Sequence, residues 1–390
     1  MSENTEVVVI GGGYAGVMAA NRLTQRDDVD VTLINPRPGF VERIRLHQLI
    51  GGSHSAVTDY RDVLAGRVRL VVDTATRIDA AGRTVALAGG GTLGYDYLVY
   101  AVGSANAGTD VPGAADFAHP VATFEEAQRL REVLDAAPAA AVTVVGAGPA
   151  GIETAAELAE RGRAVTLVCG GELGPYLHPR GRRSVAEHLA ELGVTILDGA
   201  AVTAVTPTGV SLDDGRELPS PVTVWTAGFG VPDLAARSGL STDTTGRLRT
   251  DETLTSVDDG RVVAAGDSAA PSDLPFRMGC QSAVQLGPQA AETVLARIAG
   301  TAPAPIGVGF AGLCLSLGRT HGLFQFSHRD DHAIKLYVGG RPGAKLKEFV
   351  CRSTVKQLAY EARKPGVRKW WVTDRKRQDL LPAPVGELRS

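Results

Sequence analysis

The chain has 390 residues and a formal net charge of −3, with 44% hydrophobic and 21% charged residues. This length exceeds what one compact core usually holds, and the composition is globular, which excludes a disordered chain and a small single-core module. The sequence contains no run of 18 apolar residues and its start lacks a basic signal segment, so we expect two or three domains in a cytoplasmic protein without a membrane span.

The first predicted strand and helix flank a glycine-rich turn. Glu6–Ile10 is a β-branched apolar run, Gly11–Gly16 reads G-x-G-x-x-G, and Val17–Arg26 has a helical pattern. This arrangement is the fingerprint of dinucleotide binding. The first glycine turns the chain, the second lets the backbone approach a pyrophosphate, and the third lets the helix pack against the strand. Val29–Ile34 then predicts a second, parallel strand.

A second fingerprint begins 135 positions after the first. Gly146–Gly151 follows the strand pattern Ala141–Val145 and opens another alanine-rich helix. One copy alone is a weak signal, because glycine-rich turns are common in α/β proteins. Two copies in the same setting predict two dinucleotides in one chain, as an enzyme requires when electrons pass from a nicotinamide to a flavin.

The other patterns complete two units that alternate strands and helices. Strands are predicted at 68–72, 84–87, 97–102, 222–227 and 261–265, a linker near 112–113, and a helix at 123–136. Such alternation indicates parallel sheets. From about Ile306 the chain becomes a separate region, rich in β-type residues and ending in a basic tail.

These motifs, in this order, resemble the two-dinucleotide-binding-domain flavoproteins, the pyridine nucleotide–disulfide oxidoreductase superfamily. Within it the chain is most similar to type II NADH dehydrogenases and their ferroptosis-suppressor relatives. The resemblance covers about 7–297 and includes Tyr97–Ser104, Trp225–Gly228 and Val263–Asp267. It implies an α/β fold with two Rossmann-like doubly wound domains and a smaller C-terminal α+β region. The FAD domain would span 1–112 and 245–305, interrupted by an NAD(P)H domain at 113–244, with the C-terminal region at 306–390.

The resemblance also implies which residues contact the cofactors. For FAD it implies Gly11, Gly13, Tyr14, Ala15, Gly16, Asn35, Arg43, Ala101, Gly103, Gly266, Asp267, Gln281, Ser282 and Ala283. For NADH or NADPH it implies Gly146, Gly148, Pro149, Ala150, Gly151, Glu153, Cys169, Ala227 and Gly228.

Both units depart from the usual pattern at the ribose. An Asp or Glu normally follows the glycines by about 20 residues and binds the ribose hydroxyls. Asn35 and Cys169 stand at those two positions. The choice between NADH and NADPH therefore stays open, with Arg180, Arg182 and Arg183 as nearby basic residues.

Four residues are candidates for the chemistry. Gln281 and Gln285 resemble the A-Q-x-x-x-Q quinone-site signature of type II NADH dehydrogenases, with Cys280 in place of the alanine, and two amides one turn apart can hydrogen-bond a quinone carbonyl. The alternative is that both are ordinary polar helix positions. Glu153 would lie near the nicotinamide and flavin, although the helix dipole alone favours a glutamate there. His47 is a candidate proton donor, with a packed histidine as its alternative.

The four cysteines exclude one common redox device. Cys169, Cys280, Cys314 and Cys351 lie far apart in sequence, without C-x-x-C or metal-ligand spacing. We therefore expect no redox-active disulfide and no metal, and direct reduction of the acceptor by the flavin.

The C-terminal 50 residues carry 13 Lys and Arg against 5 Asp and Glu. Arg368, Lys369, Arg375, Lys376 and Arg377 surround the Trp370–Trp371 pair. Such a segment suits the anionic inner face of a membrane. The alternatives are a solvated tail, or one packed against the acidic body of a homodimer. We expect no nucleic-acid partner.

The resulting prediction is an FAD-dependent oxidoreductase that passes a hydride from NAD(P)H to FAD and two electrons to a quinone-like acceptor. One alternative is an NAD(P)H-dependent reductase of a small electron-carrier protein. Another, from a different class, is a redox-responsive regulatory protein that binds FAD and NAD(P)H.

Overall fold

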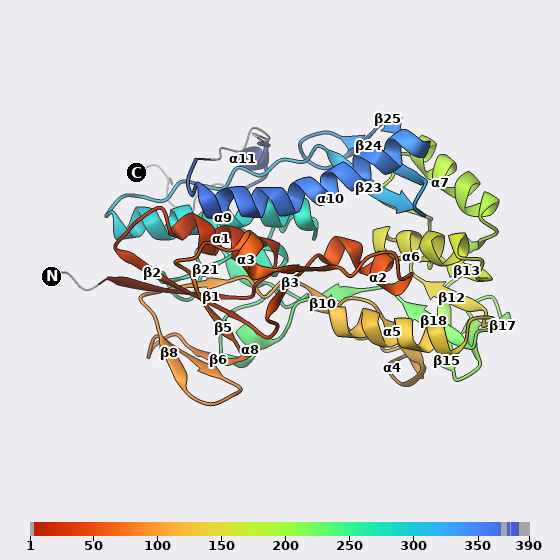
Figure 1. Cartoon of the computed structure of the whole chain (residues 1–390), viewed down its shortest axis with the longest axis horizontal. Helices are drawn as coiled ribbons and strands as arrows, with labels where there is room; N and C mark the ends of the chain where they lie inside the picture. The colour runs from red at the N-terminus through yellow and green to blue at the C-terminus, as the bar shows by residue number, and fades with distance from the viewer. Residues whose placement is uncertain (1–3, 368–372, 375, 382–390) are drawn as a thin grey trace, which may run out of the picture.

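The computed structural model describes residues 4–367, 373–374 and 376–381. Two five-stranded parallel sheets with flanking helices form two units, and a small antiparallel sheet lies over the second (Figure 1). The long helix α10 (Gly340–Arg363) runs along both units. This arrangement confirms the predicted α/β class with a C-terminal α+β region.

The first sheet has strand order β21-β9-β1-β2-β5, and all its pairs are parallel. Its strands are β1 (Thr5–Ile10), β2 (Val29–Asn35), β5 (Arg69–Val72), β9 (Tyr97–Tyr100) and β21 (Val262–Ala264). The central strand β1 is covered on both faces, which explains why its last four residues are all apolar and buried. Helices α1 (Tyr14–Leu23) and α9 (Cys280–Ile298) pack against each other beside this sheet.

The second sheet repeats the design with order β11-β18-β12-β13-β14. Its strands are β11 (Ala118–Pro120), β12 (Val142–Val145), β13 (Val165–Val168), β14 (Thr195–Leu197) and β18 (Val222–Trp225). Helices α5 (Phe124–Ala136), α6 (Pro149–Glu160) and α7 (Pro179–Glu191) flank it. Thr123 and Glu126 form a capping box at the start of α5, which fixes the predicted start of this helix.

The chain passes between the units where β10 (Ala105–Asn106) pairs with β19 (Phe229–Gly230). Beyond β19, the short helix α8 (Leu234–Arg237) packs in the core of the first unit. We therefore propose that the two crossings lie near residues 106 and 229, close to the predicted boundary at 112 and before the one at 245.

Smaller elements complete the two units. The strands are β3 (Gly39–Val41), β4 (Val57–Asp59), β6 (Ala75–Asp79), β7 (Thr84–Leu87), β8 (Thr92–Gly94), β15 (Val202–Thr206), β16 (Gly209–Leu212), β17 (Glu217–Pro219), β20 (Leu248–Thr250) and β22 (Ala269–Pro271). The short helices are η1 (Arg43–Arg45), α2 (Leu46–Ile50), α3 (Tyr60–Val63), α4 (Ala114–Phe117), η2 (Gly266–Ser268) and α11 (Arg377–Leu380).

The C-terminal region joins the two cores. Strands β23 (Gly312–Leu317), β24 (His321–Ser327) and β25 (Ala333–Val338) form an antiparallel sheet whose Leu315 and Leu323 are buried in the second core. At its far end α10 places Leu358 in the first core. Helix α10 therefore holds the C-terminal sheet and both units together.

Part of the basic tail packs on the body of the protein. The Arg377 guanidinium ion-pairs with Glu252 at 2.9 Å and stacks 4.3 Å from the centre of the Phe276 ring. The residues 368–372 and 375, and with them the Trp pair, lie outside the described residues. None of the helices in the described ranges has the length and apolarity needed to cross a bilayer.

Candidate functional site

The glycines of both fingerprints have the geometry that their spacing predicts. Gly11 and Gly146 have φ angles of +104° and +105°, which favour glycine. A Cβ on Gly16 would lie 1.8 Å from the Gly11 carbonyl oxygen, and a Cβ on Gly151 would lie 1.8 Å from that of Gly146. The first and third glycines are therefore required for the turn and for close helix packing.

The second glycines face open space. A Cβ on Gly13 or Gly148 would meet no atom within 4 Å. These two residues are the N-caps of α1 and α6, and neither helix has a side-chain cap or an acidic residue in its first turn. The helix N–H groups are thus left to an external acceptor, and the helix dipole favours an anion there. Both cradles fit a dinucleotide pyrophosphate.

Asp267 connects three segments of the first unit. Its carboxylate accepts hydrogen bonds from the Ser104 hydroxyl at 2.7 Å and from the Gly279 N–H at 2.9 Å. The Arg43 guanidinium in turn donates to the Ser104 hydroxyl at 3.1 Å. Burial lowers the pKa of Arg43, and no carboxylate ion-pairs with this guanidinium within the described residues. A half-buried cation so placed suits an anionic cofactor.

Asn35 builds the first fingerprint turn. Its side-chain oxygen accepts the Gly12 N–H at 3.0 Å, and its amide nitrogen donates to the Arg37 carbonyl at 2.9 Å. The Tyr60 hydroxyl donates to the Gly12 carbonyl at 2.8 Å. The predicted contact of Asn35 with a ribose stays a prediction, because the amide already serves the turn.

The two glutamines of α9 hold the segment before β23. The Gln285 amide donates to the Gly309 carbonyl at 3.0 Å and to the Gln281 carbonyl at 2.9 Å. In the orientation that satisfies both of its polar atoms, the Gln281 side chain bonds Ala311 and Gly312. Their direct contact with a quinone stays a prediction, since the structure engages both amides with backbone groups.

A buried ion cluster lies where the second unit, the C-terminal helix and the first unit meet. The Lys347 ammonium of α10 is 2.8 Å from the Glu153 carboxylate of α6. The other carboxylate oxygen lies 3.4 Å from Nδ1 of His47 in α2, and the Ser316 N–H donates to Glu153 at 2.9 Å. Glu153, His47 and Lys347 are all less than 10% exposed. The fold thus brings two of the predicted residues together and adds a lysine to them.

Burial and charge set the protonation states of this cluster. Burial lowers the pKa of His47 to about 4, against the opposing charge of Glu153, so the imidazole is neutral at pH 7. Burial alone would raise the pKa of Glu153, but the Lys347 charge and two hydrogen bonds bring it below its usual value. Burial likewise opposes the charge of Lys347, but Glu153 raises the pKa of Lys347 above its usual value. The cluster is therefore an ion pair beside a neutral histidine.

The state of His47 predicts how stability depends on pH. Because the folded pKa lies below the ordinary value near 6.5, protons bind preferentially to the unfolded chain between about pH 6.5 and pH 4. Stability should fall on acidification through this window, by on the order of 3 kcal/mol from this group. In thermal melts, His47→Gln should lose less stability than wild type between about pH 6.5 and pH 4. His332→Gln, at an exposed position, should lose as much stability as wild type. Identical profiles for His47→Gln and wild type would contradict the assignment.

A hollow of about 740 Å³ opens over the ion cluster. Its lining includes Gln48, Ser316 and Lys347 together with the exposed ring of Phe349. Lys347 is not among the residues that the sequence motifs indicate. Its signal was the buried face of α10, where two charged residues, Lys347 and Glu361, interrupt a helical series of small or apolar ones: Gly343, Cys351, Thr354 and Leu358. A lysine within such a series requires a buried partner.

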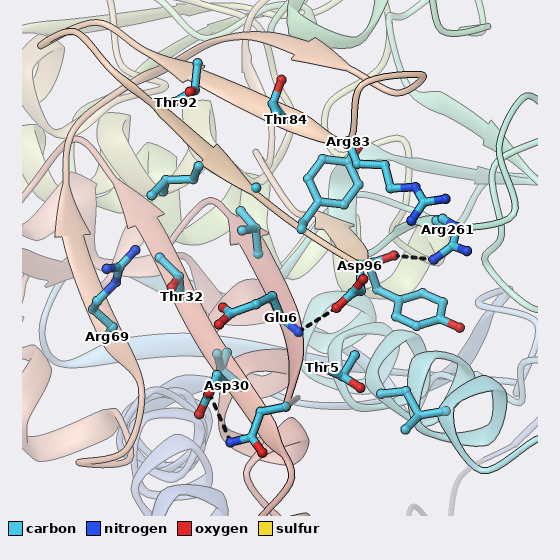
Figure 2. Close-up of a pocket in the computed structure, with 18 of the residues that line it drawn as sticks. Thr5, Glu6, Asp30, Thr32, Arg69, Arg83, Thr84, Thr92, Asp96 and Arg261 are labelled. Carbon is cyan, nitrogen blue, oxygen red and sulfur yellow. Dashed lines mark hydrogen bonds between the residues drawn. The ribbon is translucent and has the colours of Figure 1, made fainter. Parts of the chain in front are cut away.

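A larger hollow lies elsewhere and does not belong to this site. Its volume is about 1340 Å³, and its lining includes Thr5, Glu6 and Tyr97, which begin β1 and β9. Figure 2 shows Arg69 and Arg83 on opposite sides of this hollow, with the Glu6 N–H bonded to Asp96 between them. Ligands of open parallel sheets bind at the carboxyl ends of the strands, where the fingerprint glycines lie. This hollow is at the opposite edge.

Comparison with known proteins decides the family. Residues 5–293 match the model of the pyridine nucleotide-disulphide oxidoreductases. The chain belongs to this family. An NADH dehydrogenase-like protein of Mycobacterium tuberculosis is 34% identical over 296 residues, which cover 68% of this chain and 73% of that protein. The type II NADH:quinone oxidoreductase Ndh of the same organism is 29% identical over 344 residues, covering 76% and 74%.

A solved structure shares the fold over nearly the whole chain. The structure of NDH2 from Plasmodium falciparum in complex with NADH superposes with a TM-score of 0.78 over 95% of this chain and 99% of that one. The sequence identity is 15%, so this likeness shows the fold.

The family name includes a disulphide that this chain does not form. All four cysteines lie within the described residues and are free. Burial raises the pKa of Cys280 to about 12 and that of Cys351 to about 11, which keeps both thiols protonated and unreactive. The expected absence of a redox-active disulfide is confirmed.

Proposed function

We propose that the chain is an NAD(P)H:quinone oxidoreductase whose flavin passes two electrons directly to the acceptor. Family membership makes it a flavin-dependent oxidoreductase that uses FAD and a nicotinamide dinucleotide. The observation that carries the acceptor proposal is the buried Glu153–Lys347 pair beneath an open hollow. The curated relatives named as quinone oxidoreductases support the same acceptor class.

The first fingerprint would hold FAD and the second NAD(P)H. In the first unit, the Gly13 cradle would hold the pyrophosphate, Arg43 would add positive charge, and Asp267 would reach the sugar chain beside Gly103 and Gly266. At the start of α9, residues 281–283 would present backbone N–H groups to the flavin, where negative charge grows on reduction. Bound FAD would supply hydride acceptance and two-electron transfer. These assignments follow the sequence motifs, and the open second glycines support them.

In the second unit, the cradle at Gly148, Pro149 and Ala150 would hold the nicotinamide dinucleotide. Ala227 and Gly228 follow β18 at the same edge of the sheet, where they would border the nicotinamide. The Trp225 indole N–H donates to the Ala227 carbonyl at 2.9 Å, and the Thr226 hydroxyl bonds the Gly146 carbonyl at 3.0 Å. These bonds fix the loop against the fingerprint turn.

The ion cluster would serve the acceptor. Reduction of a quinone to a quinol consumes two electrons and two protons, so a proton source beside the acceptor is required. The Lys347 ammonium would donate a hydrogen bond to a quinone carbonyl and a proton to the oxygen as it is reduced. Glu153 would hold the lysine in place and keep it charged. Neutral His47 would face the other carboxylate oxygen through Nδ1 and help to hold Glu153 in place.

The test separates the two half-reactions. Anaerobic mixing of the FAD-loaded protein with NADH or NADPH should bleach the flavin within seconds, and menadione should then restore its absorbance. Ferredoxin and oxygen, offered separately, should restore it at least tenfold more slowly. Faster reoxidation by ferredoxin would establish the reductase of a carrier protein instead. Binding of NADH without bleaching would establish the redox-responsive regulatory protein.

We also propose peripheral contact of the C-terminal region with the inner face of the membrane. The hollow that holds Lys347 has a mainly basic rim with one exposed ring: Arg319, Arg341, Lys345, Phe349, Arg352 and Lys356. One carboxylate, that of Glu348, pairs with Arg319 and Arg352 in this rim. Cosedimentation with phosphatidylglycerol vesicles at low salt should retain the protein, and neutral vesicles should not. Recovery in the supernatant with both vesicle types would reject membrane contact. The homodimer stays a prediction that sedimentation velocity would check.

A further inference from the structure

The second unit carries a carboxylate beside the position where the ribose acid is missing. Strands β12, β13 and β14 are parallel neighbours, and Gly146, Cys169 and Asp198 directly follow their ends. The Gly146 N–H donates to the Val168 carbonyl at 2.9 Å, and the Cys169 N–H donates to the Leu197 carbonyl at 3.0 Å. Gly146, Cys169 and Asp198 therefore form a row along the carboxyl edge of the sheet, with neighbouring strands about 4.8 Å apart.

The Asp198 side chain contacts the loop after β13 and the neighbouring Cys169. One carboxylate oxygen accepts the Leu173 N–H at 3.0 Å, which ties Asp198 to the loop after β13. The carboxylate also accepts a hydrogen bond from the Cys169 thiol; burial first, and this bond second, raise the pKa of Cys169 to about 12. The small protonated thiol thus orients the carboxylate that lies one strand away. Asp198 itself is exposed, and a carboxylate has about four acceptor sites, so acceptors remain for a ligand.

This feature is specific to the second unit. In the first unit Asn35 takes the position of Cys169, and the register of β2 with β5 pairs Asn35 with Val72. Val72 therefore stands where Asp198 stands in the second unit. The position paired with Asn35 in the first unit is thus neutral, whereas the one beside Cys169 in the second unit is charged.

The nearby arginines do not neutralise this charge. Arg182 donates to the Leu173 and Leu177 carbonyls and pairs with Glu172, so it holds the loop. Across the described ranges no lysine or arginine ion-pairs with Asp198. The edge where the adenosine ribose would lie is thus negative.

We propose that Asp198 recognises the ribose hydroxyls of the nicotinamide dinucleotide, which makes NADH the preferred donor over NADPH. This inference rests on the proposed function, because it requires the second fingerprint to bind that nucleotide. A carboxylate accepts hydrogen bonds from the 2′- and 3′-hydroxyls and repels a 2′-phosphate.

Ligand binding without turnover tests the inference. Calorimetry on the FAD-loaded protein should give ADP-ribose at least tenfold tighter binding than 2′-phospho-ADP-ribose. Asp198→Asn should narrow this ratio by about tenfold or more, as expected for the loss of a hydrogen bond to a charged group. Asparagine keeps an oxygen for the Leu173 N–H, so the loop is preserved. Glu187→Gln, which removes an exposed charge from α7, should leave the ratio unchanged.

Flavin bleaching separates the possible failures. One outcome is that NADH and NADPH bleach the flavin while Asp198→Asn leaves the ratio of the ADP-ribose and 2′-phospho-ADP-ribose affinities unchanged. In that case Asp198 has no part in recognition, and the inference alone is overturned. Tighter binding of 2′-phospho-ADP-ribose than of ADP-ribose by the wild-type protein would also overturn the inference. Arg180 and Arg183 would then be the candidates for binding the 2′-phosphate. If neither nucleotide binds or bleaches the flavin, the proposed function fails together with the inference.

Discussion

Replacing Lys347 with methionine should separate donor oxidation from acceptor reduction. Flavin bleaching by NADH should stay within about threefold of wild type, whereas reoxidation by menadione should slow by about 10²-fold or more, the usual loss of a general acid. The reason is that Lys347 supplies the ammonium that contacts Glu153 beneath the acceptor hollow. Stopped-flow absorbance at the flavin band measures both steps.

The same substitution leaves a buried carboxylate without its cation, which costs about 3–5 kcal/mol of stability. The double variant Lys347→Met, Glu153→Gln removes both charges and should recover most of the thermal stability while staying slow with menadione. Lys345→Met, at an exposed position of the same helix and hollow, should match wild type in both half-reactions. Wild-type reoxidation rates in the folded double variant would remove the ion pair from the chemistry.

Alanine at the third glycine of each fingerprint should have two distinct effects. Gly151→Ala puts a Cβ 1.8 Å from the Gly146 carbonyl oxygen and 2.7 Å from the Thr226 hydroxyl. The protein should keep its FAD, but bleaching by NADH should fall by at least about 10²-fold, because the nucleotide cradle is displaced by about an ångström. Dithionite should still reduce the flavin, and menadione should reoxidise it at the wild-type rate.

Gly16→Ala makes the corresponding clash in the first unit, where its Cβ would lie 1.8 Å from the Gly11 carbonyl oxygen. We expect this variant to purify with little FAD, measured as the ratio of flavin to protein absorbance. Gly66→Ala, with no atom within 4 Å of the added Cβ, is the matched control and should retain FAD. If Gly151→Ala lost FAD and Gly16→Ala did not, the second fingerprint would be the FAD site and the first the nicotinamide site.

Local patterns in the sequence were enough for the two nucleotide-binding units. Each unit is indicated by a β-branched run, a glycine-rich turn and a helical pattern. All three lie within about 30 consecutive residues, so a short segment of sequence is enough to recognise the unit. The structure confirms the α/β class, and the capping box at Thr123 shows how exactly such a local signal places a helix end.

For the site residues too, the local sequence gives candidates and the tertiary structure gives their surroundings. Glu153 and His47 were singled out from their positions in the sequence, but each retained an alternative as a merely packed or dipole-favoured residue. Only the fold gives them a shared environment, because it places His47 and Lys347, the latter from a helix almost 200 residues after Glu153, on opposite oxygens of the Glu153 carboxylate. Gln281 and Gln285 were indicated by their spacing in the sequence. That spacing does not reveal the backbone groups to which their side-chain amides hydrogen-bond.

The sequence by itself determined that two dinucleotide cradles exist, because a G-x-G-x-x-G turn needs only its own glycines and the adjoining strand and helix. Only the tertiary structure decided what surrounds them. The protonation state of His47 depends on burial, the charge of Lys347 on a partner from another unit, and the position of Asp198 on strand register. Burial, ion pairing and strand neighbours are long-range properties, and they are set when the chain folds.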